Sequence, residues 1–478
     1  MPLPTSHRSF LFFKIILIVC LCLCHSESYT QAGRNPGAYY VSVPAGEEYK
    51  KGKFYQWLLG TNHRLEWITP VDAKIVLLDT LHGGLMPYKK GGGNESKTLR
   101  LRSERGKEYV MRSVNKSRKA VTPGLFRGSF ISDFIQDGVS MSHPYACLAI
   151  AGMSSAAGVF HPQPVLVYIP RQPALDDYND KYGDDLYLVE ERPEGSWEDD
   201  ANMGYFKQFE STLKLLKKMQ ADNEWEVDQR HYIRSRLFDI LLADWDRQQD
   251  NWRWGTREYN GKRMKPFSRD RDQAFFVTDG KLTRLLRPLL HVRFMQNFFG
   301  RDNNATVLTL QDRDMDNLFA NEMSQEDWAS ASRYLQTVLT DSVIEASVKN
   351  LPATIYHLSG DKLISKLKAR RDQLGQSALD LYKVLARKVA VNGSEKDERF
   401  VVTMPETGRV LVRVFRLNNK VAAEQPYYSR VFAIGDTRQV TMFGFGGNDE
   451  VQIDPQIRGM RIHFTKGHNK NHLFKKDD

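Results

Sequence analysis

The sequence predicts an α+β protein that has two lobes and a C-terminal antiparallel β domain. Up to about residue 195, short runs of alternating apolar and polar residues indicate strands, and Gly and Pro mark the turns between them. Residues 196–390 instead carry apolar side chains at helical spacing, and the alternation returns from residue 391. We therefore expect a strand-rich lobe at 83–195, a helix-rich lobe at 196–390 and a β domain at 391–478.

The first 26 residues have the pattern of a secretory signal peptide. Arg8 and Lys14 come before the uncharged apolar run Ile15–Cys24, which small and polar residues follow. The run is shorter than the roughly 20 residues that a membrane-spanning helix needs. We therefore expect loss of residues 1–26 and export to the periplasm or the cell surface. A lipid anchor stays open as an alternative, because the run holds three of the four cysteines, Cys20, Cys22 and Cys24.

Composition indicates a globular body without cross-links. The chain has 41% hydrophobic and 26% charged residues, and its 478 residues suffice for two or three domains. Loss of Arg8 and Lys14 lowers the formal net charge from +10 to about +8 (10 − 2). Cys147 is the one cysteine outside the signal peptide, so no internal disulfide is expected. The basic charges are interspersed, which fits either a solvated surface or attraction to phosphates, anionic glycans or lipid headgroups.

A glycine-rich loop and a hairpin begin the strand-rich lobe. Residues 27–82 before it mix short apolar runs with Gly and Pro, which indicates a β-rich N-terminal segment. A cluster of three glycines at 91–93 then precedes an alternating strand, Lys97–Arg102. After a turn, a second strand is predicted at Tyr109–Val114, so the loop is followed by a β-hairpin.

A helix and two strands complete this lobe. The apolar stretch Pro144–Ala157 predicts a helix that Gly158 ends. The segment PVLVYIP at 164–170 predicts a strand, and LYLVEERPEG at 186–195 predicts another that runs into charged residues and a Pro-Gly bend.

Helices and then strands fill the rest of the chain. Phe209–Met219 and Val227–Leu242 have apolar residues three and four positions apart, which predicts helices. Further helices are predicted at Glu326–Val348 and Lys362–Ala386. From about Val391, runs such as RVLVRVFRL and QVTMFGFGG alternate, which predicts a small antiparallel β domain.

Two acidic loops in the helix-rich lobe carry the candidate chemistry. In DWDRQQDNW, Asp246 and Asn251 lie five residues apart after a buried helix, and in SRDRDQAF, Asp270 and Asp272 lie on or beside a strand. Phosphoryl transfer needs such a set, because one carboxylate orients a hydroxyl while an amide oxygen and a second carboxylate hold Mg²⁺ against the phosphates. The alternative is a buried salt-bridge network that holds two helices together.

With the glycine-rich hairpin before them, these loops resemble the atypical protein-kinase-like fold, most closely HipA-type and CotH-type kinases. The resemblance covers roughly residues 83–300 and implies a two-lobed protein-kinase-like domain. It implies that Asp246 is catalytic and that Asn251 and Asp272 bind the metal, with Asp270 as the fallback for Asp272. The same stretches are similar to an uncharacterised region appended to bacterial calcineurin-like metallophosphoesterases, but the chain lacks the Asp-x-His and Gly-Asn-His clusters of a dinuclear hydrolase.

The resemblance also implies a nucleotide site between a phosphate-covering loop and a hinge segment. The implied cofactors are ATP or another nucleotide, together with Mg²⁺ or Mn²⁺. The implied nucleotide-binding residues are Gly91, Gly92, Gly93, Lys97, Glu190 and Glu191.

Three features depart from the family pattern. Arg112 stands where a phosphate-pairing lysine is expected, and its permanent charge pairs phosphates with a different geometry. Gln248 replaces a His that is usual in the catalytic loop. The stretch Pro144–Ala157 offers no acidic partner for Arg112, which leaves Asp137 and Glu108 as the candidates.

The predicted function is an exported phosphotransferase whose acceptor is a protein, a glycan or a small molecule. The alternative is a catalytically inactive, pseudokinase-like binding protein, because an exported bacterial protein meets little ATP. A third hypothesis is that residues 391–478 dock to an outer-membrane or other envelope component. We expect no nucleic-acid partner.

Overall fold

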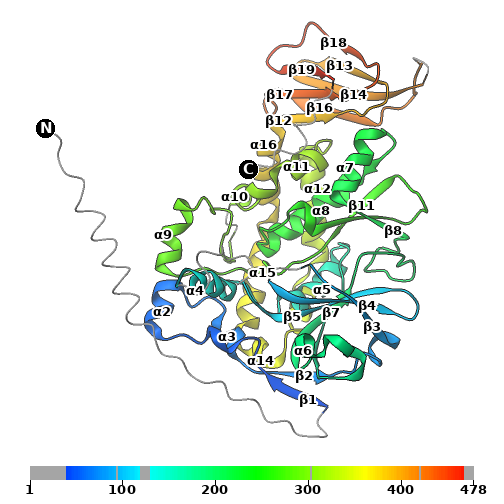
Figure 1. The fold of residues 1–478 in the computed structure, drawn as a ribbon. Coiled ribbons are helices and arrows are strands. Elements are labelled where there is room, and N and C mark those ends of the chain that lie inside the picture. The colour runs from blue at the N-terminus through cyan, green and yellow to red at the C-terminus, as the bar shows by residue number, and fades with distance from the viewer. Residues whose placement is uncertain (1–38, 93–94, 119–129, 302–303, 419–420, 468–478) are drawn as a thin grey trace, which may run out of the picture.

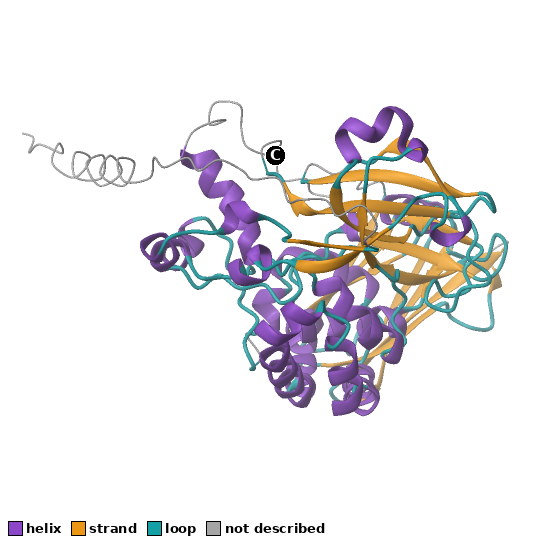
Figure 2. Cartoon of the chain, turned by 90° about the horizontal axis from the view of Figure 1, so that it is seen from below, coloured by secondary structure: helices purple, strands orange, loops and turns teal. Residues whose placement is uncertain are grey.

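The structure is a computed structural model that describes residues 39–92, 95–118, 130–301, 304–418 and 421–467 (Figure 1). The expected signal peptide, residues 1–26, and the predicted site residue Gly93 lie outside these ranges. Within them, no helix combines the length and the hydropathy that a bilayer-spanning segment requires. The predicted α+β class is confirmed, and Figure 2 shows a body of packed helices beside the strands.

A seven-stranded sheet organises the first lobe, in the order β1-β2-β6-β7-β5-β4-β3. The predicted N-terminal segment, residues 27–82, supplies β1 and β2, and β2 pairs with β6. The segment therefore extends the sheet of the strand-rich lobe and does not form a separate unit. The strands are β1 (Tyr40–Val43), β2 (Val71–Ile75), β3 (Leu85–Lys90), β4 (Ser96–Ser103), β5 (Glu108–Lys116), β6 (Val165–Ile169) and β7 (Asp185–Glu191). The helices of this part are α2 (Lys53–Leu59), α3 (Arg64–Ile68), α4 (Phe130–Asp137), α5 (Ala146–Ala156) and α6 (Asn179–Tyr182).

The two faces of this sheet belong to two different hydrophobic cores. Along β5, Val114 packs into the core that continues through the helical lobe, whereas Met111 packs into the core on the other face. Side chains alternate along a strand, so Arg112 and Lys116 share the face of Val114. The central strands therefore aim polar side chains toward the helical lobe.

The second lobe packs helices around a small four-stranded sheet, β8-β10-β11-β9. Two predicted long helices are each divided: Glu326–Val348 breaks where Thr340 caps a new helix, and Lys362–Ala386 breaks at Gln373. The strands are β8 (Gln208–Ser211), β9 (Glu226–Val227), β10 (Trp252–Thr256) and β11 (Arg263–Ser268). The helices are α7 (Thr212–Ala221), α8 (Gln229–Leu242), α9 (Lys281–Leu289), α10 (Ala305–Leu308), α11 (Arg313–Phe319), α12 (Gln325–Val338), α13 (Asp341–Val348), α14 (Ala353–Ile355), α15 (Asp361–Asp372) and α16 (Leu374–Ala386).

The C-terminal β-rich region is confirmed, but its pairing is mixed and not antiparallel throughout. β13, β14 and β16 pair antiparallel, whereas β12 with β17, β17 with β19, and β13 with β18 pair parallel. Alternation shows that one face of a strand is buried, but it does not specify the direction of the neighbouring strand. The strands are β12 (Lys388–Asn392), β13 (Glu398–Glu406), β14 (Arg409–Asn418), β15 (Val421–Ala422), β16 (Tyr428–Ala433), β17 (Gln439–Gly444), β18 (Glu450–Ile453) and β19 (Arg461–Lys466).

Candidate functional site

Helix α8 ends directly before the first acidic loop. The Asp228 side chain caps its N-terminus by accepting a hydrogen bond from the His231 N–H (3.0 Å). At the other end Ala243 has φ 55°, a left-handed conformation that stops the helix and turns the chain. Asp244 and Asp246 follow this turn. Burial raises the pKa of Asp244, which shows that the loop enters the interior.

The fully buried side chain of Arg247 joins the two acidic loops. Its Nη1 and Nη2 donate to the Arg269 carbonyl oxygen (2.7 and 2.8 Å), and Nη2 also donates to the Asp270 carbonyl oxygen. An Asp244 oxygen lies 3.6 Å from Nη2 and balances its charge. A buried network of the kind considered from the sequence is therefore present, and it holds the two acidic loops side by side.

Both loops face a cavity of about 440 Å³ between the strand-rich and helix-rich lobes. Asp246, Asp270 and Asp272 line it from the loops, and Gly91 and Gly92 line it from the turn between β3 and β4. The structure thus brings together predicted residues that lie far apart in the sequence. The cavity is also lined by Arg112, Lys116, Glu190, Glu191 and Trp245.

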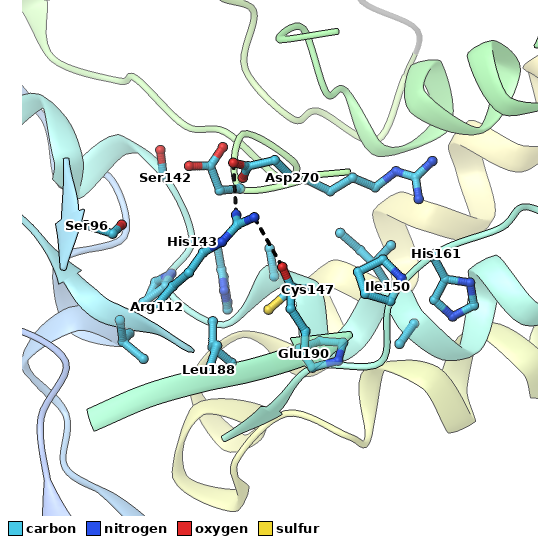
Figure 3. A pocket seen from close by; sticks show the side chains of 18 of the residues that line it. Ser96, Arg112, Ser142, His143, Cys147, Ile150, His161, Leu188, Glu190 and Asp270 are labelled. Carbon is cyan, nitrogen blue, oxygen red and sulfur yellow. Dashed lines mark hydrogen bonds and ion pairs between the residues drawn. The ribbon is translucent and has the colours of Figure 1, made fainter. Parts of the chain in front are cut away.

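Strand β5 brings two cations to these carboxylates. One nitrogen of Arg112 lies 2.9 Å from an Asp270 oxygen, and the other lies 3.3 Å from Glu190 (Figure 3). Lys116, four residues along the same strand, forms an ion pair with Asp272. The cavity wall therefore carries both cations and carboxylates. It can bind a ligand group of negative charge through the former and one of positive charge through the latter.

The charges in the cavity shift pKa values in both directions. Burial alone would raise the pKa of Asp270, but nearby cations, Arg112 foremost, hold it below its usual range. Burial raises the pKa of Glu190, and the charge of Arg112 offsets only part of this rise. The pKa of Asp246 rises to about 6, through burial first and then through the negative charge of Asp272. Asp246 therefore has the proton affinity of a base that works near neutral pH.

Asp246 also has a buried oxygen that lacks a partner in the described part of the chain. Its Oδ1 is buried and makes no hydrogen bond there. Leaving a buried carboxylate oxygen without a partner costs free energy, and carboxylate oxygens are the ligands that Mg²⁺ and Mn²⁺ prefer. Because Asp270 and Asp272 line the same cavity, the donor set fits a divalent cation.

The structure places Asn251 beside Asp246, outside the set of residues that line the cavity. Its side-chain amide donates to the Asp246 carbonyl oxygen (2.8 Å), and it is not among the residues that line the cavity. The hydrogen bond uses the amide nitrogen and not the side-chain oxygen, which is the atom that would bind a metal ion, so the metal-binding role of Asn251 stays a prediction.

The prediction for Lys97 is wrong, because this side chain points away from the cavity. Its Nζ pairs with Asp185 at 2.8 Å, at the edge of the lobe. Its neighbours Ser96 and Thr98 line the cavity, so alternation along β4 directs Lys97 to the opposite face. Among the described residues, Lys116 is the lysine that lines the cavity, and it was not among the residues predicted from the sequence.

Within the strand-rich lobe the acidic partner of Arg112 is Glu190 on the neighbouring strand β7, and it is neither of the two candidates considered from the sequence. Asp137 is engaged by Arg64, whose nitrogen lies 2.6 Å from its carboxylate. Glu108 pairs with two other arginines, on β4 and just after β7. Pairing of β5 with β7 places residue 112 opposite residue 188, so Glu190 lies within reach of Arg112.

Glu191, the other predicted hinge residue, is held differently. Its carboxylate accepts a hydrogen bond from the Gln163 N–H (2.6 Å). Burial raises the pKa of Glu191 to about 7. Glu191 lines the cavity at its strand-β7 side, beside Glu190, but its side chain is engaged by the segment before β6.

A smaller pocket of about 110 Å³ lies on the inner side of Arg112 (Figure 3). Cys147 and Ile150 on α5 and Leu188 on β7 give it apolar walls. Burial raises the pKa of the Cys147 thiol, so it is neutral and unreactive at physiological pH. The pocket therefore combines these apolar walls with the charged side chains of Arg112, Glu190 and Asp270.

No protein-family model matches the sequence, and no curated protein matches it. Among solved structures, the chain is similar to the Helicobacter pylori proinflammatory kinase CtkA, with 11% identity, 62% of this chain and 96% of that chain covered, and a TM-score of 0.34. It is also similar to the Golgi casein kinase, with 10% identity, 72% and 84% coverage and a TM-score of 0.27. Since both TM-scores are below 0.5, the functional conclusions rest on the residues of this chain.

Proposed function

We propose that this protein is an exported, kinase-like phosphotransferase that uses a nucleotide and a divalent metal ion. One observation carries the proposal: three carboxylates, Asp246, Asp270 and Asp272, meet two cations, Arg112 and Lys116, in one cavity beside a glycine turn. Phosphoryl transfer depends mainly on positioning and on neutralisation of phosphate charge. A cavity that offers both carboxylates for a metal and cations for phosphates suits that reaction.

Each side chain has a distinct proposed role. Asp246, with its pKa of about 6, accepts the proton of the acceptor hydroxyl at neutral pH. Asp270 and Asp272, with the unpartnered oxygen of Asp246, would hold Mg²⁺ or Mn²⁺. When bound, the metal ion supplies charge neutralisation at the phosphate oxygens. Arg112 and Lys116 bind the phosphates from the side of β5.

Ligand binding would exchange partners within the cavity. Arg112 and Lys116 pair with Asp270 and Asp272 in the structure. A metal ion would take over the two carboxylates, and the phosphates would take over the two cations. Because both signs of charge gain a new partner, the exchange leaves no buried charge unpaired.

Replacement of Lys116 is expected to weaken nucleotide binding much more than replacement of Lys97. Lys116→Ala removes a cation from the cavity, and a charged hydrogen bond of this kind contributes about 1.5–3 kcal/mol, or roughly a 10- to 150-fold change in Kd. Lys97→Ala removes a half-exposed lysine on the other face, so we expect less than about a twofold change. Calorimetric titration with ATP and Mg²⁺ measures both. Equal effects of the two substitutions would refute the placement of the phosphates.

A non-catalytic binding protein is the second candidate, and one observation favours it. Asn251 is not among the residues that line the cavity, so one of the metal ligands that the resemblance implies lies outside it. Such a protein would bind nucleotide and metal through the same cavity without transferring phosphate.

Transfer from γ-labelled ATP, with Mg²⁺ or Mn²⁺, tests the proposal and separates the two candidates. Wild-type protein is expected to label itself or an added acceptor, and the Asp246→Asn variant is expected to lose this activity. Stabilisation by nucleotide and metal without any transfer would instead support the binding protein.

The proposal also covers where the protein works and which acceptors it modifies. The apolar run Ile15–Cys24 supports a signal peptide, and we propose that the protein works in the periplasm or at the cell surface on a protein, glycan or small molecule. The C-terminal β region, residues 391–478, is proposed to contact an envelope component.

A further inference from the structure

Helices α2 and α9 lie side by side (Figure 1), and both expose large apolar side chains. Leu285, Leu289 and Leu290 are 60–66% exposed at the end of α9, and Phe54 and Trp57 of α2 are 62% and 54% exposed. We call these five residues the α2–α9 patch. Single exposed apolar residues are common, but a cluster that includes Trp, Phe and three Leu marks a binding surface.

Close packing makes the patch continuous. Gly280, just before α9, approaches the end of α2 so closely that a Cβ there would lie 2.3 Å from the Leu59 carbonyl carbon. The ammonium of Lys281 lies 4.5 Å from the centre of the Trp57 ring, and the Phe54 ring stacks on Trp57 with centroids 5.9 Å apart. Lys281, Leu285 and Leu289 follow one another at intervals of four residues, so they lie along one side of α9, and Lys281 places that side next to Trp57.

Positive charge surrounds the patch. Residues 50–62 and 281–300 contain seven Lys or Arg, three in the first segment and four in the second, and no Asp or Glu. The neighbouring carboxylate of Asp279 is already bonded by the Thr61 hydroxyl and the Asn62 N–H. The patch thus offers apolar side chains inside a cationic rim.

A hollow of about 520 Å³ beside α9 gathers three arginines, Arg287, Arg293 and Arg301. None of them forms an ion pair with a carboxylate among the described residues. Burial, and then the charge of Arg284, lower the pKa of Arg287. Guanidinium groups that line one hollow suit phosphate oxygens.

We propose that the α2–α9 patch docks the protein onto the surface of a bilayer that contains anionic phospholipid. Trp, Phe and Leu side chains would enter the interface between headgroups and acyl chains, and the arginine hollow would take the phosphate of a headgroup. Apolar side chains and free cations on one surface match both parts of such a lipid. This function is independent of the phosphate transfer proposed above.

Sedimentation of the full chain with vesicles tests the proposal. The protein is expected to bind vesicles of phosphatidylcholine with phosphatidylglycerol more tightly than vesicles of phosphatidylcholine alone. Leu285→Ser/Leu289→Ser is expected to lower the partition coefficient by about tenfold or more, because two apolar side chains no longer enter the membrane interface. The matched control Leu213→Ser/Val421→Ser changes two exposed apolar residues elsewhere and is expected to leave binding unchanged.

Quenching by bromine-labelled lipid locates the contact directly. Emission of the wild type is expected to fall on binding, and the Trp57→Phe variant is expected to lose most of that decrease. The proposal is overturned if the patch variant binds like the control or if Trp57 is not quenched. It is equally overturned if inorganic phosphate displaces the protein while the patch variant has no effect, because the site would then bind free phosphate and not a bilayer.

Discussion

Asp246→Asn is expected to lower the rate of phosphate transfer by about 10²- to 10⁴-fold, the usual contribution of a general base. Asn has nearly the same shape, but it cannot accept the proton of the acceptor hydroxyl. Folding should persist, because the substitution removes a buried negative charge that Asp272 and Asp270 repel. The melting temperature is therefore expected to stay the same or to rise.

The pH dependence of the wild-type transfer rate tests the role of Asp246 as a base independently. A base with a pKa of about 6 is protonated, and thus inactive, at lower pH. A cation bound at Asp270 and Asp272 would offset the negative charges that raise this pKa, so the transfer rate should rise with pH and level off at or below about pH 6. Asp250→Asn is the matched control, since Asp250 is exposed in the same loop, and its rate should remain within about twofold of the wild type. A full rate in Asp246→Asn would exclude Asp246 as the base.

Arg236→Met is expected to cost about 3–5 kcal/mol of the free energy of unfolding, because it strips the partner from buried carboxylates. The Arg236 side chain is 1% exposed, and its Nε lies 2.6 Å from an Asp316 oxygen. Asp312 and Asp239 lie 3.3 and 3.4 Å from its other nitrogens. Helix α8, which precedes the acidic loop, is thereby tied to α11 through Asp316 and to the residue before α11, Asp312.

Measurement of urea unfolding, with a nearby arginine as control, tests this expectation. Arg230→Met changes an arginine of the same helix whose side chain is 77% exposed, so its cost should be within about 0.5 kcal/mol. Burial raises the pKa of Asp312 to about 7, and loss of Arg236 would raise this pKa further. The defect should therefore shrink as pH falls and the buried acids take up protons. Equal costs for the two substitutions would show that the network does not stabilise the lobe.

Local patterns predicted the elements well where one physical signal dominated. Periodicity predicted the helix that became α8, and its capping by Asp228 sets its start within two residues of the expected bound. The same signal did not reveal the break at Thr340, because apolar spacing continues across a short interruption whose cause is a capping hydroxyl.

The acidic loops were predicted as candidates, but the pairing of their charges was not. Glu190 reaches Arg112 through the pairing of β7 with β5, two strands far apart in sequence, and no local pattern encodes that neighbour. The prediction for Lys97 failed because its side chain lies on the face of β4 opposite to the cavity. Strand period alone would have placed Lys116 on the face of Arg112, since they lie four residues apart, but the predicted strand stopped at Val114.

Diffraction from crystals grown with Mn²⁺ and a non-hydrolysable ATP analogue tests the central claim most directly. We expect an anomalous manganese signal in contact with Asp246 and at least one of Asp270 and Asp272, with phosphate oxygens beside Arg112 and Lys116. A cavity that stays without manganese and nucleotide, or a manganese signal bound elsewhere on the protein, would contradict it.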